Sequence, residues 1–129
     1  MENFNKRNED FFNVVCEIQR EGIAGRPVSI PFAVKKAINR QAPSFYLTRE
    51  HVWKQLHERR RRLPPKEKPH RRRMWDEIGR ALNARLREHP GEDPWVALDH
   101  VLANHRPSGF FITEEYARKL IYRKMRGKL

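Results

Sequence analysis

One pattern occurs twice in this chain, and it constrains the fold more than any other feature. Residues 43–50 read P-S-F-Y-L-T-R-E, and residues 107–115 read P-S-G-F-F-I-T-E-E. In each copy a proline precedes two aromatic residues and an aliphatic residue, and a threonine with acidic residues beyond it follows. Proline ends a helix, whereas threonine before acidic residues is typical of a helix N-cap. Each copy therefore predicts the end of one helix and the start of another.

The similarity between the two halves extends beyond this motif. An offset of 64 pairs Phe11 with Trp75, and it continues as far as the proline and serine of the motif. One inserted residue, Gly109, shifts the offset to 65, which then pairs Thr48 with Thr113. So many pairs with a single gap indicate an internal duplication. We expect each repeat to form a helix, a loop, a second helix, a turn and a third helix.

Apolar residues recur at three- and four-residue intervals in six segments, which predicts an all-α protein of about six helices. The first helix is expected at residues 8–20. The second carries Phe32 to Ile38 and ends at Pro43, and the third follows the Thr48 cap and carries Val52 to Leu63. The fourth carries Trp75 and ends before His89, the fifth begins near Asp93, and the sixth follows Thr113. We expect two tandem, helix-turn-helix-like units related by internal pseudo-symmetry and sharing one compact domain. The expected bounds are 1–63 and 74–129, with a basic, proline-rich linker at 64–73.

The aromatic and aliphatic residues of the motif have a structural interpretation. Leu47 precedes the Thr48 cap and Val52 occupies the fourth helical position, which is the spacing of a hydrophobic staple. Phe45 and Phe110 are expected to plug the gap between the two helices that each turn joins. Any functional surface is therefore expected on the helix that each motif starts.

The charge of the chain indicates the class of partner. It has 28 Lys and Arg against 16 Asp and Glu, a net charge of +12, and the two halves share the excess equally. Such a chain attracts polyanions, and nucleic acid is the expected partner. The one cysteine, Cys16, excludes an intramolecular disulfide and favours a reducing compartment. No apolar stretch is long enough for a signal peptide or a membrane span, so we expect a soluble, cytoplasmic protein without a membrane partner.

The duplicated motif also carries a resemblance. A helix, then P-S-F-Y-L-T, then a helix with a basic end, repeated within a short chain, resembles a group of small uncharacterised proteins from bacterial phage and conjugative-element gene sets. These proteins have similar P-x-F-Y-[VL]-[ST] motifs in each half. The resemblance implies a mobile-element context and no particular chemistry. The second copy departs from the pattern through the inserted Gly109 and through Phe111 in place of tyrosine.

A short helix, a turn and a following helix with a basic face form the layout of a helix-turn-helix, whose second helix enters the major groove of DNA. Duplex DNA is therefore the favoured ligand, with the linker arginines on phosphates. The expected nucleic-acid-binding residues are Arg49, Lys54, His57, Arg61, Arg62, Arg71, Arg72, Arg73, Arg118, Lys119, Tyr122, Arg123 and Arg126.

The sequence favours a binding protein over an enzyme. The six histidines form no H-x-x-x-H pair, one cysteine cannot supply a zinc finger, and glycine-rich phosphate loops are missing. We therefore expect no catalytic residue, cofactor or metal. Two alternatives stay open: RNA binding as an accessory subunit of a nucleic-acid enzyme, and a protein–protein adaptor. In the adaptor, Trp53, Trp75 and Trp95 would form a partner or oligomer interface.

Overall fold

The computed structural model describes residues 4–127, which form six helices and no β-strand. The predicted all-α fold is therefore confirmed. The first helix begins at Phe4, earlier than the predicted residue 8. The helices are α1 (Phe4–Glu21), α2 (Ile30–Ile38), α3 (Arg49–Arg61), α4 (Pro69–Glu88), α5 (Pro94–Asn104) and α6 (Glu114–Met125).

The two threonines of the motif cap the helices that follow them, as predicted. The Thr48 hydroxyl accepts a hydrogen bond from the His51 amide at 3.3 Å, at the start of α3. The Thr113 hydroxyl accepts one from the Tyr116 amide at 3.1 Å, at the start of α6. Each bond satisfies an amide that has no partner within its helix, so each motif fixes where its helix begins.

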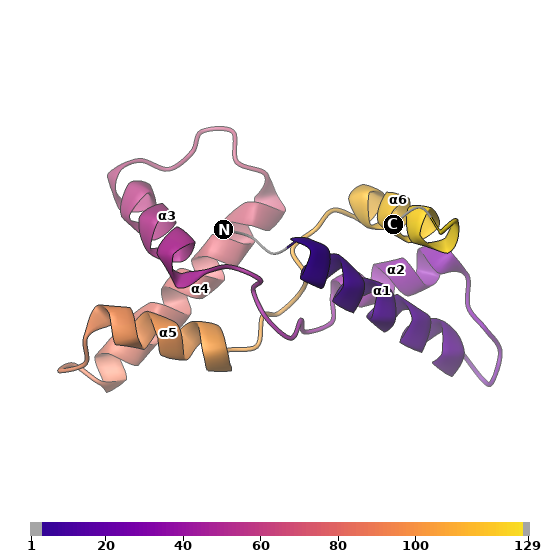
Figure 1. Ribbon diagram of the computed structural model, residues 1–129, viewed down its shortest axis with the longest axis horizontal. Helices are drawn as coiled ribbons and strands as arrows, with labels where there is room; N and C mark the ends of the chain where they lie inside the picture. Colours follow the sequence, from indigo (N-terminus) through magenta and orange to yellow (C-terminus); the bar gives the residue numbers. More distant parts are fainter. Residues whose placement is uncertain (1–3, 128–129) are drawn as a thin grey trace. The chain divides into compact units, whose positions relative to one another are not determined.

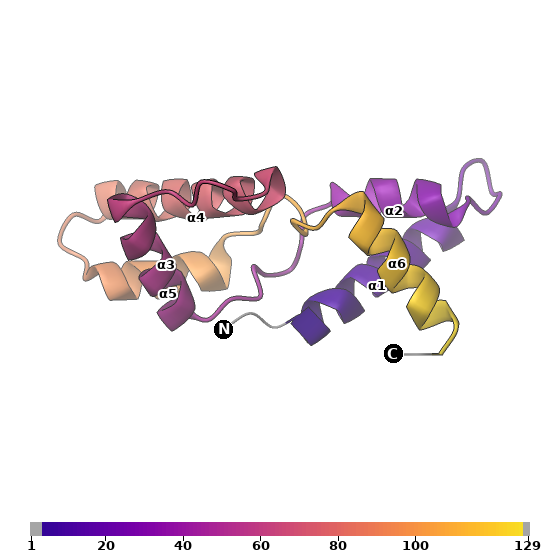
Figure 2. The ribbon, with the colours of Figure 1, turned by 90° about the horizontal axis from the view of Figure 1, so that it is seen from above.

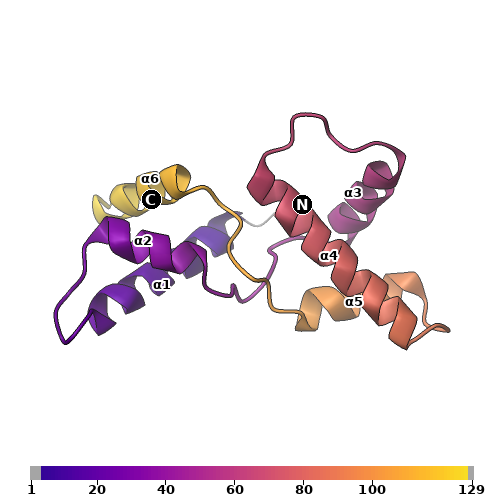
Figure 3. The same ribbon diagram turned by 180° about the vertical axis from the view of Figure 1, so that it is seen from behind.

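The helices group into two compact units that differ from the predicted tandem units. One unit comprises residues 44–107 and contains α3, α4 and α5, while the other comprises residues 4–43 and 108–127 and contains α1, α2 and α6. Figures 1 and 3 show the two groups, and Figure 2 shows α6 lying across α1 and α2. In the first unit α5 packs on α3 and α4, and in the second α6 packs on α1 and α2. The predicted units 1–63 and 74–129 are therefore corrected: each third helix packs with the first two helices of the other repeat.

The two motif segments are the physical reason for this exchange. Residues 39–48 and 105–113 are non-helical, so neither segment reverses the chain in a tight turn. An extended stretch of this length reaches roughly 30 Å, which is far enough to carry the chain out of one packed unit and into another. The predicted helix-turn-helix is corrected for the same reason, because α2 and α3 lie in different units.

An unusual backbone conformation marks both motif segments. Tyr46 has a φ of 60° and Phe111 a φ of 56°, values in the left-handed region that residues other than glycine adopt rarely. The repeat offset of 65 pairs these two positions. In the first segment the Tyr46 amide donates a hydrogen bond to the Ser44 hydroxyl at 2.8 Å, and the Tyr46 side chain is buried. Burial and this local hydrogen bond hold Tyr46 in a conformation that its side chain disfavours.

The phenylalanines of the motif are buried, but in different places from those predicted. Phe110 packs edge-on against Phe11 of α1, with ring centroids 5.2 Å apart. Phe45 stacks on His105, just beyond α5, at 5.9 Å. Each phenylalanine therefore belongs to a core that both repeats build, rather than filling the space between the helices that its own segment joins.

The inserted Gly109 approaches the end of α2 closely. A Cβ atom built at this position would lie 2.9 Å from the carbonyl oxygen of Ile38, closer than real Cβ contacts. Because that neighbour is backbone, it cannot move aside as a flexible side chain could. The close approach therefore favours glycine at the inserted position.

We predict that Gly109→Ala lowers the free energy of unfolding by about 1–3 kcal/mol, the usual cost of overpacking. Gly91→Ala is the matched control, because a Cβ at position 91 would meet nothing within 4 Å. Urea unfolding followed by circular dichroism measures both variants. Equal stability of the two variants would contradict the close approach.

The exchange of third helices leads to a second prediction, which concerns how fragments of the chain fold. Fragments 1–64 and 65–129 separate the helices of both units, so each fragment alone should be poorly folded, whereas their mixture should recover helicity. Fragment 44–107 contains all of the α3/α4/α5 unit and should fold by itself. Far-UV circular dichroism and the dispersion of amide NMR signals measure folding. Independent folding of 1–64 and of 65–129 would instead support the tandem units.

Candidate nucleic-acid interface

The densest positive charge lies where α3 ends and α4 begins. We call this region the basic corner: Arg60, Arg61, Arg62, Lys66, Lys68, Arg71, Arg72 and Arg73. Figure 3 shows the loop of residues 62–68 arching from the end of α3 to the start of α4. The predicted linker at 64–73 is therefore corrected, because it lies within one unit and its last five residues belong to α4. Pro69 explains the early start of α4, since proline is favourable in the first turn of a helix.

An ion pair ties the loop back to α3. Both carboxylate oxygens of Glu67 accept hydrogen bonds from Arg59, at 2.8 and 2.6 Å, and the side chains are only 11% and 9% exposed. Arg72 also lies 3.8 Å from Glu67. The one carboxylate of the loop is therefore occupied by protein cations. Arg59 is structural, and the rest of the basic corner keeps its excess positive charge.

The helix dipoles do not explain this placement of arginines. Basic residues in the last turn of α3 are favourable, because a helix C-terminus carries partial negative charge. The start of α4 is the reverse case: it has no acidic residue in its first turn, and its N-cap, Lys68, makes no side-chain capping bond. Arg71, Arg72 and Arg73 therefore repel the positive end of α4. The helix dipole therefore gives no reason for this charge.

The residues predicted on α3 divide between structural and exposed positions. Lys54, His57, Arg61 and Arg62 are exposed. Arg49 instead packs within its own unit, where its guanidinium is hydrogen-bonded to Asp99 and lies 4.6 Å from the Trp95 ring centroid on α5. The hydrogen bond to Asp99 is the main reason that the pKa of Arg49 is raised. Arg49 therefore holds α3 against α5 and is removed from the candidate interface.

The residues predicted on α6 are exposed, and they lie in the other unit. Lys119 pairs with Glu115 at 3.3 Å on the surface of the helix, and Arg126 donates a hydrogen bond to the Tyr122 carbonyl at 3.3 Å. Arg118 and Arg123 form no ion pair within residues 4–127. The predicted set is therefore divided, and only Arg61, Arg62 and the three α4 arginines gather in the basic corner.

The tryptophans of the adaptor alternative pack inside the α3/α4/α5 unit. Trp75 is 3% exposed. Trp53 and Trp95 are half-buried and meet edge to face, with ring centroids 5.2 Å apart. Their packing joins α3 to α5, so it gives no support for a tryptophan surface that awaits a partner.

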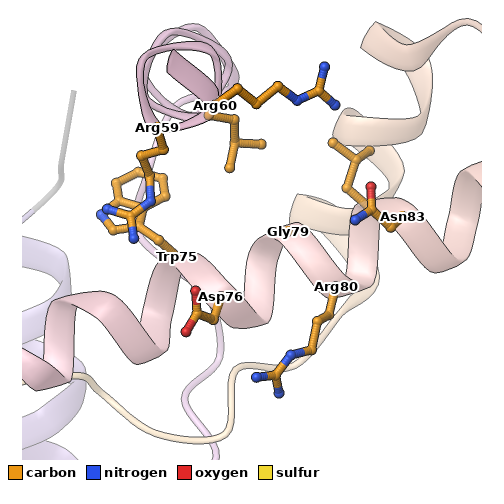
Figure 4. A pocket seen from close by; sticks show the side chains of 9 residues that line it. Arg59, Arg60, Trp75, Asp76, Gly79, Arg80 and Asn83 are labelled. Atoms are coloured by element: carbon orange, nitrogen blue, oxygen red, sulfur yellow. The ribbon is translucent and has the colours of Figure 1, made fainter. Parts of the chain in front are cut away.

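A groove between α3 and α4 adjoins the basic corner, and the sequence analysis missed it. The cavity has a volume of about 450 Å³. Figure 4 shows Trp75 and Asn83 on the side of α4 that faces α3, Arg59 and Arg60 extending from α3, and Asp76 and Arg80 on the other flank of α4. Leu56, Trp75 and Leu82 supply its apolar lining. The sequence signal was Gly79, a glycine inside an otherwise regular helical pattern.

The chain was compared with known proteins, and no family model, curated protein or solved structure matches it. Within residues 4–127, no group of three or more His, Cys, Asp or Glu side chains is placed to hold a metal ion. None of the helices in that part of the chain is both long enough and apolar enough to cross a membrane.

We predict that Glu67→Ala lowers the free energy of unfolding by about 1–3 kcal/mol, because it leaves the nearly buried Arg59 without its partner. Glu58→Ala is the control, because Glu58 is exposed, lies next to Arg59 on α3 and carries the same charge as Glu67. Urea unfolding measures both variants. If Glu67→Ala and Glu58→Ala lower the free energy of unfolding equally, the ion pair does not hold the loop.

Proposed function

We propose that this protein binds nucleic acid without catalysis, and that duplex DNA is its ligand. The observation that carries the proposal is the composition of residues 59–73, which hold nine Lys and Arg against one acid, Glu67. That acid is already paired with Arg59. An exposed surface with so large an excess of cations is suited to a polyanion.

The basic corner suits phosphate contacts better than base reading. Its arginines come from a helix end, a loop and another helix start, so they present several separate guanidinium groups rather than one helix inserted into a groove. Guanidinium groups bind phosphate oxygens bidentately. Contacts of this kind position a protein on DNA and release counterions, which makes the affinity strongly dependent on salt.

The exposed basic face of α6, with Arg118, Tyr122 and Arg123, is a second proposed contact. It rests on exposure and charge alone. The motif resemblance supports a bacterial phage or mobile-element context for such a protein. RNA is the alternative ligand, because phosphate contacts carry little information about the type of nucleic acid.

We predict that Arg61→Ala/Arg62→Ala/Arg73→Ala weakens duplex binding at least tenfold at about 0.1 M salt. The slope of log affinity against log salt should become shallower by about 2–3, since roughly 0.9 counterions are released per phosphate contact. The control is Arg20→Ala/Arg26→Ala/Lys35→Ala, which removes the same charge from exposed positions of the other unit. Fluorescence anisotropy with duplex DNA, single-stranded DNA and structured RNA, each titrated with salt, measures the effect.

Two outcomes would contradict the proposal. If the wild-type protein binds none of the three nucleic acids more tightly than micromolar at low salt, nucleic-acid binding is wrong. If both triple variants lose affinity equally, the net charge of the chain binds the polyanion and the basic corner is not the interface. Tighter binding to the structured RNA than to the duplex would favour the alternative ligand.

A further inference from the structure

The groove between α3 and α4 depends on Gly79. Glycine is the least favourable helix residue after proline, and Gly79 lies in the middle of α4. A Cβ at this position would meet no heavy atom within 4 Å, so no neighbour requires a glycine there. In the repeat register, with its offset of 64, Gly79 corresponds to Val15, which is 1% exposed. The first repeat fills this position with a buried side chain, and the second leaves a hollow.

The size and the lining of the hollow limit what can occupy it. Its volume of about 450 Å³ lies within the range of small-molecule sites, about 300–1,000 Å³. Two apolar lining residues, Trp75 and Leu82, are already 3% and 6% exposed. Little apolar area is therefore left for an amphipathic helix, which needs an apolar groove several residues long. A compact polar ligand fits better.

Two polar residues of the groove, Asn83 and Arg60, match a nucleotide, whereas Asp76 and Arg80 lie on the other flank of α4. The Asn83 side chain is exposed at its edge and has no hydrogen-bond partner within residues 4–127. Its amide offers a donor and an acceptor together, the pair that base edges recognise. Arg60, which forms no ion pair in the same part of the chain, extends from α3 on the other side and can bind phosphate. Arg60 also belongs to the basic corner, so the groove and the corner are continuous.

We propose that the α3–α4 groove holds one unpaired nucleotide of a nucleic acid bound at the basic corner. The base lies over Gly79, the Asn83 amide bonds its edge, and Arg60 binds an adjacent phosphate. The nucleotide must be unpaired, because a base within a duplex is stacked and its pairing edge is occupied. This inference rests on the proposed function, since the basic corner holds the flanking duplex.

The test compares three fluorescent DNA probes: a fully paired duplex, the same duplex with one extra unpaired nucleotide at its centre, and the same bulge without a base. The wild-type protein should bind the bulged duplex about tenfold more tightly than the paired one, a ratio typical of one good amide–base contact. The abasic bulge should bind like the paired duplex. It controls for the greater flexibility of bulged DNA.

Variants of the groove then locate the preference. Gly79→Leu fills the hollow and Asn83→Ala removes the amide, so each should reduce the ratio of bulged to paired affinity to about one. Gly91→Leu is the matched control: it makes the same substitution at an exposed glycine outside the groove, where a Cβ would meet nothing within 4 Å, and it should keep the ratio. Thermal unfolding by circular dichroism shows whether each variant is folded. Because the readout is a ratio of affinities on one protein, a small loss of folded material does not change it.

The outcomes separate this inference from the proposed function. Tight binding of all three probes with equal affinity overturns the nucleotide site and leaves duplex binding intact. The site is also wrong if the abasic bulge binds as tightly as the bulge with a base, or if folded Gly79→Leu keeps the preference. Failure to bind any probe at low salt overturns both proposals.

Discussion

Each core of this protein is completed by a helix from the other repeat, and the rest of the structure depends on that exchange. Without α6, the buried faces of α1 and α2 would be exposed, and without α3 the same holds for α5. Burial of apolar area is the main stabilising contribution in such small units. The two motif segments make the exchange possible, because each crosses between the units in a non-helical conformation and then starts its helix at a fixed threonine.

The contacts that hold the α3/α4/α5 unit together also position the candidate interface. The Trp53–Trp95 contact and the Arg49 bond to Asp99 hold α3 against α5. The Arg59–Glu67 pair then anchors the loop that leads into α4. Cations that hold the unit together and cations of the candidate interface are thus neighbours in sequence. Arg49 and Arg59 have short carboxylate contacts that hold the unit together, and the excess positive charge gathers at the basic corner.

Local signals in the sequence predicted where the helices lie, but they could not predict which helices pack together. The threonine caps and the apolar periodicity identified all six helices, because these signals act within a few residues. These signals do not say which helices a third helix packs against. Because the two repeats are similar, the pattern is the same whether the third helix packs on its own repeat or on the other. Arg49 was assigned to the interface because its partner, Asp99, is 50 residues away. Gly79 was visible, but the groove beside it exists only once α3 is in place.

The exchange also fixes an order for building the protein on the ribosome. Residues 44–107 form one unit from a continuous stretch of chain, so that unit can close as soon as α5 has been made. The α1/α2/α6 unit is discontinuous, and its first two helices must wait for α6, which follows all the others. A chain made from its N-terminus therefore completes the basic corner before it completes the α1/α2/α6 unit. During that interval the apolar faces of α1 and α2 are open to other proteins, including a second nascent copy.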